Sequence, residues 1–456
     1  MAYYILFSKI ISRIRAAAQL DKVVAYGLIT RVWALISGPV TIVLMASNFS
    51  AEMQGYYYTF ASMIGLQIFI ELGFSVVILQ FLSHEWAGLR LNRQGVIEGD
   101  IGSFMKLAGI FIFSVRWYLI CALILFVTLS LIGCLFLSVH SGEDIVWVMP
   151  WVLLCFATAL NMSMLPFITF IEAIGEQKFV YKIRLISAII NSMLVWILIY
   201  LKYDLWVGAI CAFAVFFYTL ANLVLNYKNL FEQIYKCANK TNRMNWRQDV
   251  FPMQWRIAVS WISGYFIYSS FVPIIFTYQG PVLAGSMGMT LAIVNVVSMV
   301  ASAWVTPKAP TFTTLIAKRK YAELDQLFVQ ISKIVITVSL ITTVLIWFFV
   351  VKLGGLGVLF FEKIYMRLLP ESSFILFLLS SFVYSCIGTM PVYLRAHRRE
   401  PLMYYSIFYA FAVFLSTIIF AKYFSIEEVA IVNLLINIFF SFVMYLVWRI
   451  CKRNWH

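Results

Sequence analysis

Long, nearly uninterrupted runs of hydrophobic residues recur along the whole chain, and short polar segments separate them. Each run holds roughly 20 residues or more, enough for an α-helix to cross a hydrocarbon core about 30 Å thick. Strands of a membrane barrel would alternate apolar and polar residues, and these runs do not. We therefore predict an all-α polytopic membrane protein with twelve spans, at 25–48, 56–82, 107–137, 146–171, 183–201, 205–227, 257–278, 283–306, 327–351, 372–394, 402–421 and 427–449.

The longest polar connection, at 228–256, divides the chain into two sets of six spans. Two short likenesses indicate that the sets are repeats. Gly55 in the second span aligns with Gly285 in the eighth at an offset of 230, and Ala173 aligns with Ala396 at an offset of 223. Because six is even, the halves share one orientation, so we expect a two-fold axis along the membrane normal and a central cavity between them.

This pattern gives the domain organisation. We expect an interfacial helix at 1–24, where basic and apolar residues alternate as on a helix that lies on a membrane. A six-helix bundle follows at 25–227, a cytoplasmic linker at 228–256, a second six-helix bundle at 257–449 and a cytoplasmic tail at 450–456. Prolines in the first span of each half, Pro39 and Pro273, predict bends there, because proline removes a helical hydrogen bond.

Composition and charge agree with this class. The chain is 63% hydrophobic and 12% charged, with a net charge of +14, whereas soluble domains are about 25% charged. Of the 34 Lys and Arg residues, 27 lie in or beside the termini and the connections after even-numbered spans, and 5 lie in the other connections. This asymmetry predicts that both termini are cytoplasmic. The basic residues are spread over separate segments, so we do not expect a nucleic-acid partner.

Signatures of catalysis and of cofactors are absent from the sequence. "LGGLG" at 353–357 lacks the Lys-Ser/Thr that completes a phosphate-binding loop, so we expect no nucleotide. The four histidines are not spaced for a metal, and the seven cysteines form no pairing pattern. We therefore expect a transporter with no metal and no cofactor rather than an enzyme.

Charged residues inside the spans are the candidates for function, because a charge within a membrane is costly. Nineteen of the twenty acidic residues lie in connections or near span ends, and Glu71 alone lies well inside a span. At 1.5 Å per residue, Glu71 and Arg116 are roughly 15 Å from the cytoplasmic ends of their spans, and Arg31 is roughly 9 Å from its own. We expect these groups to face a wet cavity whose net positive charge favours an anion, since arginine binds phosphate bidentately.

Other interpretations of these charges stay open. Arg31 could extend to the headgroups, Glu71 and Arg116 could form a structural ion pair, and Glu71 could be protonated and hydrogen-bonded within a bundle. Further basic residues at span starts are candidates for a ring around the cytoplasmic mouth or are ordinary flanking charges: Arg184, Arg256 and Lys333.

Residues 48–85 resemble the first hairpin of polysaccharide-export flippases of the Wzx type, which share a superfamily with the MATE drug exporters and the MurJ lipid II flippases. The overall plan of twelve spans in two similar halves is similar to that family over the full chain. The motifs that carry the resemblance are Gly55-Tyr56 at the start of the second span, Glu71-Leu72-Gly73 within it, and the turns at 172–194 and 394–405.

The resemblance implies a MATE-like fold and the transfer of an undecaprenyl-pyrophosphate-linked oligosaccharide, such as an O-antigen unit of lipopolysaccharide, across a bacterial cytoplasmic membrane. Membrane lipids and the polysaccharide polymerase machinery would be its partners. Arg31 and Arg116 would hold the pyrophosphate, and Glu71 would couple transport to H⁺ or Na⁺ or act as the counter-charge of Arg116. Two alternatives stay open: a MATE-type drug or cation antiporter, and a membrane enzyme of polysaccharide assembly.

Overall fold

A computed structural model describes residues 22–92, 97–140, 145–236, 251–397 and 401–455. Most of the interfacial helix expected at 1–24 and half of the linker expected at 228–256 lie outside these residues. Within them, ten single helices are long and apolar enough to cross a membrane, and two bent helix pairs bring the number of spans to twelve. The prediction of an all-α protein with twelve spans is confirmed.

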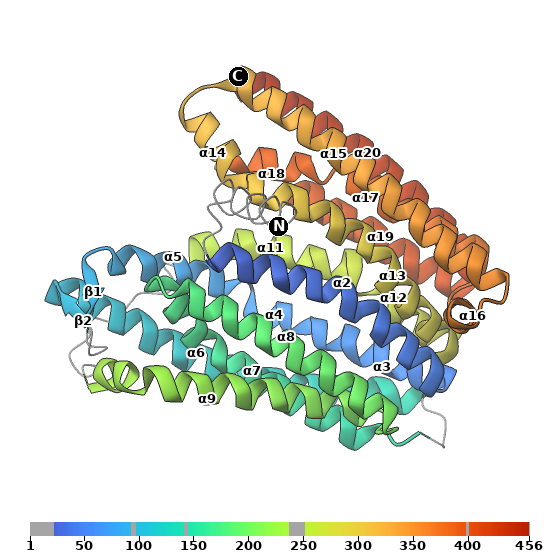
Figure 1. The fold of residues 1–456 in the computed structure, drawn as a ribbon, viewed down its shortest axis with the longest axis horizontal. Coiled ribbons are helices and arrows are strands. Elements are labelled where there is room, and N and C mark those ends of the chain that lie inside the picture. The colour runs from blue at the N-terminus through green and yellow to red at the C-terminus, as the bar shows by residue number, and fades with distance from the viewer. Residues whose placement is uncertain (1–21, 93–96, 141–144, 237–250, 398–400, 456) are drawn as a thin grey trace, which may run out of the picture.

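The N-terminal half contains the first six spans, drawn from blue to green in Figure 1. The second span consists of four consecutive helical segments, and the other five are single helices. In order they are α2 (Lys22–Asn48), then α3 (Ala51–Ile64), η1 (Gly65–Gln67), α4 (Ile68–Glu71) and α5 (Phe74–Trp86), then α6 (Ile101–His140), α7 (Val148–Ala173), α8 (Gln177–Tyr200) and α9 (Trp206–Lys236).

The C-terminal half contains the other six spans, drawn from yellow to red in Figure 1, and several of them are interrupted. They are α11 (Phe251–Tyr268) with α12 (Phe271–Gln279), α13 (Pro281–Val305) with η3 (Thr306–Lys308) and α14 (Ala309–Ala317), α15 (Tyr321–Ile346) with the π-helical η4 (Trp347–Leu353), α17 (Glu371–Cys386) with α18 (Thr389–Ala396), α19 (Met403–Tyr423) and α20 (Ile426–Trp455).

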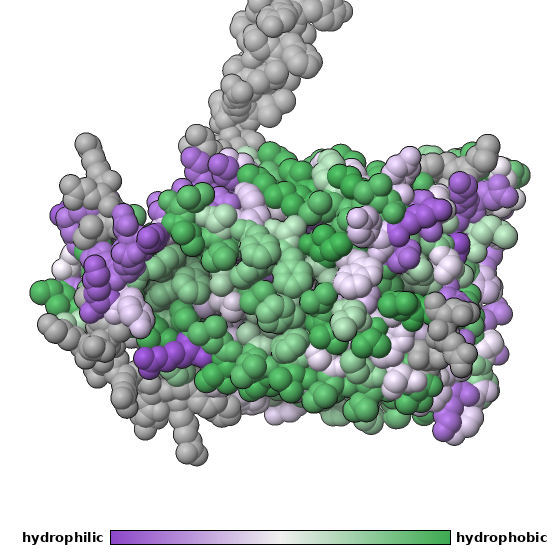
Figure 2. Space-filling view, turned by 90° about the horizontal axis from the view of Figure 1, so that it is seen from below, coloured by the Kyte–Doolittle hydropathy of each residue, from purple (hydrophilic) through white to green (hydrophobic). Residues whose placement is uncertain are grey.

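Three short elements of the described chain lie outside the spans. The strands β1 (Leu89–Leu91) and β2 (Ile97–Gly99) pair antiparallel beyond α5 and α6. The helix α16 (Leu359–Tyr365) lies at the opposite end of the molecule, between the ninth and tenth spans. We call the end with β1 and β2 the hairpin end and the end with α16 the far end. Figure 2 shows a band of hydrophobic side chains between these two more hydrophilic ends.

Several helices run past the predicted span ends. The third span was predicted to begin at residue 107, but α6 begins at Ile101, because the backbone N–H of Ser103 donates to Asp100 Oδ2 at 2.7 Å and caps the helix. The same hydrogen bond lowers the pKa of the Asp100 carboxyl. At 1.5 Å per residue, the 40 residues of α6 extend about 60 Å, twice the hydrocarbon thickness. Likewise, α9 continues to Lys236 into the predicted linker, and α20 continues to Trp455 through the predicted tail.

The bend predicted at Pro273 is present. At Pro39 the helix is not interrupted. α11 and α12 meet at 42°, just before Pro273, which cannot donate a hydrogen bond to Ser269 in the preceding turn. α2, in contrast, runs through Pro39 as one helix. The matching first spans of the two halves therefore differ in shape.

The two halves close against each other at the far end. A Cβ added to Gly55 would overlap the carbonyl of Pro281, and one added to Gly285 would come within 3.1 Å of the Ala51 carbonyl. Ala51 and Pro281 are also 230 residues apart, so each half presents the same two positions to the other. Gln54 Nε2 adds a bond across this contact by donating to the Gly285 carbonyl at 2.9 Å. Such a reciprocal contact is what a two-fold axis between repeats produces.

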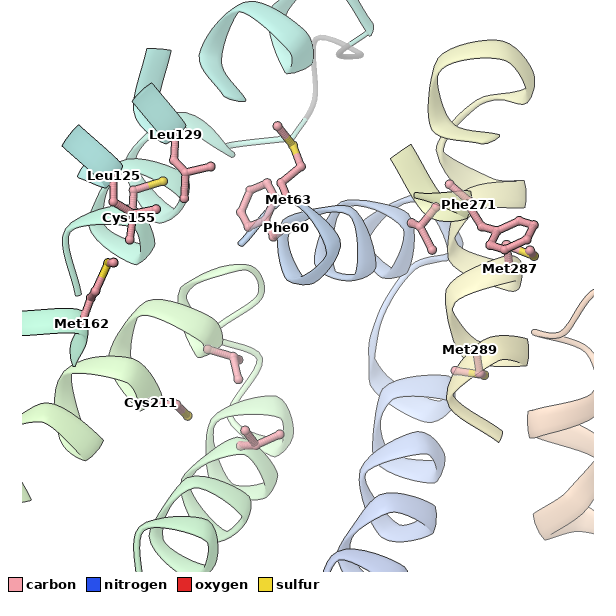
Figure 3. Close-up of a cluster of buried hydrophobic side chains, with 14 of the residues drawn as sticks. Phe60, Met63, Leu125, Leu129, Cys155, Met162, Cys211, Phe271, Met287 and Met289 are labelled. Carbon is pink, nitrogen blue, oxygen red and sulfur yellow. The ribbon is translucent and has the colours of Figure 1, made fainter. Parts of the chain in front are cut away.

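The core is continuous across this junction. Figure 3 shows Phe60 and Met63 of α3 between helices of the N-terminal half and the helices that carry Phe271 and Met287. Phe60 packs on Trp151 of α7 with ring centroids 4.9 Å apart, so the second span belongs to the core of the N-terminal half as well as to the junction.

Candidate functional site

The second span breaks immediately after Glu71. Leu72 has φ 52° and ψ 29°, and Gly73 has φ 66° and ψ 21°, so two successive residues adopt the left-handed conformation. Glycine adopts it freely, whereas leucine is strained in it. The axis turns by 46° between α3–α4 and α5. The Glu71-Leu72-Gly73 motif therefore has a structural meaning: it ends one helix and begins another inside the protein.

The Glu71 carboxylate bridges this break. Its Oε1 accepts a hydrogen bond from Ser75 Oγ at 2.6 Å and one from the Tyr118 hydroxyl at 3.4 Å. Ser75 lies in the first turn of α5, so the carboxylate is held at the positively polarised N-terminus of that helix. Discontinuous helices of transporters place ion or substrate sites at such breaks.

The third span supports the break from one side. Tyr118 and Cys121 stand about one turn apart on α6 and both face it. Cys121 Sγ donates a weak, 3.9 Å bond to the carbonyl of Ile70, one of the last carbonyls of α4. The ring of Phe74, at the start of α5, packs on Tyr118 with centroids 5.8 Å apart. Movement at the break would therefore displace contacts with α6.

The opposite side of the break contacts the C-terminal half. The Phe69 ring, two residues before Glu71, packs edge-on against Tyr265 and Phe266 of α11, with centroid distances of 5.4 and 5.6 Å. The carboxylate is thus two residues from a contact between the halves.

The chemistry available at the break is that of one carboxylate with hydroxyl neighbours. Across the part of the chain that the structure describes, no three His, Cys, Asp or Glu residues come together to hold a metal. Ca²⁺ and Mg²⁺ take six or more oxygen ligands. A single carboxylate suits a proton or a monovalent cation better.

Arg31 lies on α2, which packs mainly on α8 of its own half and also contacts α13 and α16 of the C-terminal half. Ile42, Met45 and Phe49 follow it by 11, 14 and 18 residues, which are close to whole helical turns, and these three side chains are buried. At the far end, the Phe49 carbonyl accepts a hydrogen bond from Arg367 Nη2 of the C-terminal half at 2.7 Å. Arg31 itself is half-buried, about 27 Å along the helix from this contact.

Arg116 is not beside Glu71, although the two were expected at one depth. Residues two apart on a helix point in nearly opposite directions, so Arg116 is directed away when Tyr118 faces Glu71. Arg116 is exposed, on a groove formed with α7 and α9. The 23 uncharged residues at 117–139 span about 34 Å, which is sufficient to cross a hydrocarbon core without the residues that precede Arg116.

The other predicted basic residues are not brought together. Arg184 forms an ion pair with Glu172 at 2.8 Å and lies over the Tyr181 ring, which ties it to the turn between α7 and α8. The backbone of Arg256 belongs to α11, and its side chain lies outside the described part of the structure. Lys333 is exposed on α15. The expected ring of positive charge does not form among these described side chains.

A polar network in the C-terminal half was not predicted. The Tyr409 hydroxyl donates to Asn437 Oδ1 at 2.6 Å, and Asn433 Nδ2 donates to Ser380 Oγ at 3.0 Å. With Ser298 and Tyr384, these side chains line a cavity of about 60 Å³, which has room for a few water molecules. The signal that could have found it is the pair of asparagines four residues apart in the otherwise apolar twelfth span.

No protein-family model matches the chain, and no curated protein matches it. Solved structures do. An inward-facing multidrug resistance transporter of the MATE family and the MOP superfamily has 12% identity and a TM-score of 0.64, over 95% of this chain and 99% of the other. The lipid II flippase MurJ in an inward closed conformation has 13% identity and a TM-score of 0.60, over 95% and 90%. An outward-facing MATE transporter has 13% identity and a TM-score of 0.52, over 95% and 97%.

At these identities the likeness establishes the fold. The chain has the fold of the MATE and MurJ transporters of the MOP superfamily along nearly its whole length. The MATE-like fold predicted from the sequence is thereby confirmed.

Proposed function

We propose that the protein is a flippase that moves an undecaprenyl-pyrophosphate-linked oligosaccharide, a repeat unit of a surface polysaccharide, across the bacterial cytoplasmic membrane. The fold supports a transporter, because the solved structures that share it are multidrug transporters and a lipid II flippase. Of these, the lipid II flippase supports a lipid-linked cargo. The Gly55-Tyr56 and Glu71-Leu72-Gly73 motifs resemble those of Wzx-type flippases, and this resemblance supports a lipid-linked cargo that carries an oligosaccharide.

In this proposal the hairpin end faces the cytoplasm, together with both termini. The segments that hold 27 of the 34 basic residues connect the helices at this end, as the positive-inside rule requires. With the halves closed at the far end through Gly55 and Gly285, the described conformation faces inward. Transport then requires this contact to open and the hairpin end to close, which is alternating access.

The observation that carries the cargo assignment is the placement of Arg31. It is half-buried within the first span, and no carboxylate of the described residues forms an ion pair with it. A guanidinium presents a planar fork of donors that matches two phosphate oxygens. Arg31 would hold the pyrophosphate while the lipid tail stays in the bilayer and the sugars lie in the wet space. Arg256, which begins the matching first span of the other half, is the second candidate.

Glu71 would couple this movement to an H⁺ or Na⁺ gradient. It is held across a break in the second span and lies two residues from the Phe69 contact with α11. A proton or cation arriving at Glu71 would weaken its hydrogen bonds to Ser75 or Tyr118 and so change the angle of the break. The alternative in which Glu71 acts as the counter-charge of Arg116 is not part of this proposal, because the two side chains point apart.

A MATE-type drug or cation antiporter is the second candidate, and Glu71 is the observation that favours it, since a carboxylate attracts an organic cation. The half-buried and unpaired charge of Arg31 opposes it. A membrane enzyme of polysaccharide assembly has no such support, since the described residues include no group of His, Cys, Asp and Glu that could hold a metal.

A deletion strain tests the proposal. Lipid-linked oligosaccharide should accumulate on the cytoplasmic face, and the wild-type gene should restore surface polysaccharide. Arg31→Ala should restore it poorly, whereas Arg184→Ala, which removes a charge already paired with Glu172, should restore it fully. Normal surface polysaccharide together with increased drug sensitivity in the deletion strain would instead establish the antiporter.

A further inference from the structure

A groove of about 630 Å³ runs along the side of the N-terminal half that faces away from the C-terminal half. α6 and α9 form its walls and α7 its floor, and Figure 2 views the molecule from this side. Its volume is within the range of small-molecule sites. The lining is apolar for most of its length and includes Ile112, Leu119, Met164, Phe167, Leu223 and Val224.

The groove crosses the edge of the hydrocarbon core. In α6 the uncharged stretch at 117–139 spans about 34 Å, and in α9 the uncharged stretch at 206–227 spans about 33 Å. Each is sufficient to cross a bilayer. Arg116 immediately precedes the first stretch and Lys228 immediately follows the second, so both charges stand at the same membrane boundary, at the hairpin end.

The polar end of the groove is positively charged. Arg116, Lys228 and Lys236 line it together with one acid, Glu232. Lys228 and Glu232 are 3.7 Å apart and both largely exposed, so the pair is weak and easily exchanged. No carboxylate of the described residues lies within ion-pair distance of Arg116. The groove therefore offers two net positive charges at the level of the headgroups above an apolar channel in the core.

The apolar side chains of the groove are partly open to the bilayer. Leu119 is 55% exposed and Val224 is 49% exposed, at a depth where only lipid tails can cover them. On the hairpin side of Arg116 and Lys228 the groove is bounded by aromatic rings, with Phe231 stacked on Phe111 at 5.4 Å and set edge-on against Phe167 at 5.1 Å. An occupant must thus have an anionic group and a flexible apolar chain on its membrane side.

We propose that this groove binds an anionic phospholipid of the leaflet at the hairpin end, with its phosphate between Arg116 and Lys228 and one acyl chain along Leu119, Leu223 and Val224. Basic pockets between membrane helices recognise anionic headgroups in this way. The site would fix the N-terminal half in that leaflet. It does not depend on the identity of the transported molecule.

The test titrates purified wild-type protein with phosphatidylglycerol and with phosphatidylcholine and measures bound lipid by native mass spectrometry. Phosphatidylglycerol should bind more tightly. Each basic residue near a membrane surface contributes about five-fold, so Arg116→Gln with Lys228→Gln should weaken phosphatidylglycerol binding about thirty-fold. Lys308→Gln with Lys333→Gln removes the same charge at exposed positions of the other half and should leave it unchanged.

A third variant tests the apolar channel. Val224→Trp fills the groove without changing any charge and should release both lipids. Equal retention of phosphatidylglycerol by wild type and the Arg116/Lys228 double variant would overturn the proposal, as would unchanged binding by Val224→Trp. Displacement of phosphatidylglycerol by an equimolar amount of undecaprenyl pyrophosphate would assign the groove to the transported lipid instead and would also overturn it.

Discussion

Gly55 and Gly285 occupy matching positions in the two halves and contact each other where the halves close the far end. A Cβ on Gly285 would stand 2.7 Å from the Gly55 nitrogen, closer than any side chain tolerates. Because neither residue has a Cβ, α3 and α13 approach backbone to backbone. This contact is the part of the molecule that must separate if the protein opens to the far side.

Substitution at this contact should prevent closure. Gly55→Ala places a methyl group on the Pro281 carbonyl, and a backbone carbonyl of another helix cannot turn aside as a flexible side chain would. We expect the far end to remain open and transport to fall at least ten-fold. Distance measurements between spin labels on far-end loops of the two halves would detect the change.

Gly264→Ala is the matched control for that substitution. Gly264 also lies within a helix, α11, but apart from that helix's own backbone no atom lies within 4 Å of an added Cβ. Its spin-label distances and transport should equal those of the wild type. If the far end of the Gly55→Ala variant also closes normally, close approach at Gly55 is not required for closure and this account is wrong.

The Glu71 carboxylate should set the ion dependence of transport. Glu71→Gln keeps a hydrogen-bond acceptor for Ser75 and Tyr118 but removes the charge that a proton or Na⁺ would neutralise. We expect the transport rate of this variant to become insensitive to pH and to the Na⁺ concentration. Glu85→Gln, which removes an acid at the end of the same span, should keep the wild-type dependence. A Glu71→Gln protein that still follows the ion gradient would exclude Glu71 as the coupling site.

The left-handed backbone at the break should make Gly73 sensitive to substitution. At φ 66° any residue with a Cβ is strained, by about 1–2 kcal/mol. Gly73→Ala should therefore lower the free energy of unfolding by about 1 kcal/mol. Thermal unfolding of the purified variant measures this, with Gly264→Ala again as the control. An unchanged melting temperature for Gly73→Ala would mean that the break does not have this conformation.

Arg31 should contribute most to binding of an anionic cargo. Hydrogen bonds to a charged group contribute about 1.5–3 kcal/mol, so Arg31→Ala should weaken binding of the lipid-linked pyrophosphate about 10- to 100-fold. Arg31→Lys keeps the charge and loses the bidentate geometry, so it should fall between the wild type and the Ala variant. Equal affinity in all three proteins, measured by titration of undecaprenyl pyrophosphate, would exclude Arg31 from the site.

The fold was predictable because the membrane imposes one length scale on every span. Runs of apolar residues gave twelve spans, and each of them corresponds to a helix or an interrupted helix. The alignment of Gly55 with Gly285 compared the two halves as repeats, whereas the contact between these two residues is visible only in the structure. Helix ends were less predictable, because the cap at Asp100 extends α6 well before the apolar run begins.

Hydropathy could not predict the direction in which the side chains of a span point. Arg116 and Glu71 have similar sequence depths, but which face of α6 carries Arg116 depends on the contact of Tyr118 with Glu71. The break at Leu72 was equally hidden, because a leucine with positive φ has no sequence signature. The polar network around Asn437 depends on four helices that only the fold brings together.

The central claim is tested most directly by flipping in a purified system. Proteoliposomes would contain the protein and a synthetic undecaprenyl-pyrophosphate-linked sugar with a fluorescent label, and an impermeant quencher would report how much label has crossed. Our account predicts crossing with wild-type protein, little with Arg31→Ala or Gly55→Ala, and wild-type crossing with Gly264→Ala. Wild-type protein that leaves the labelled lipid in place while exchanging an organic cation for H⁺ or Na⁺ would contradict it.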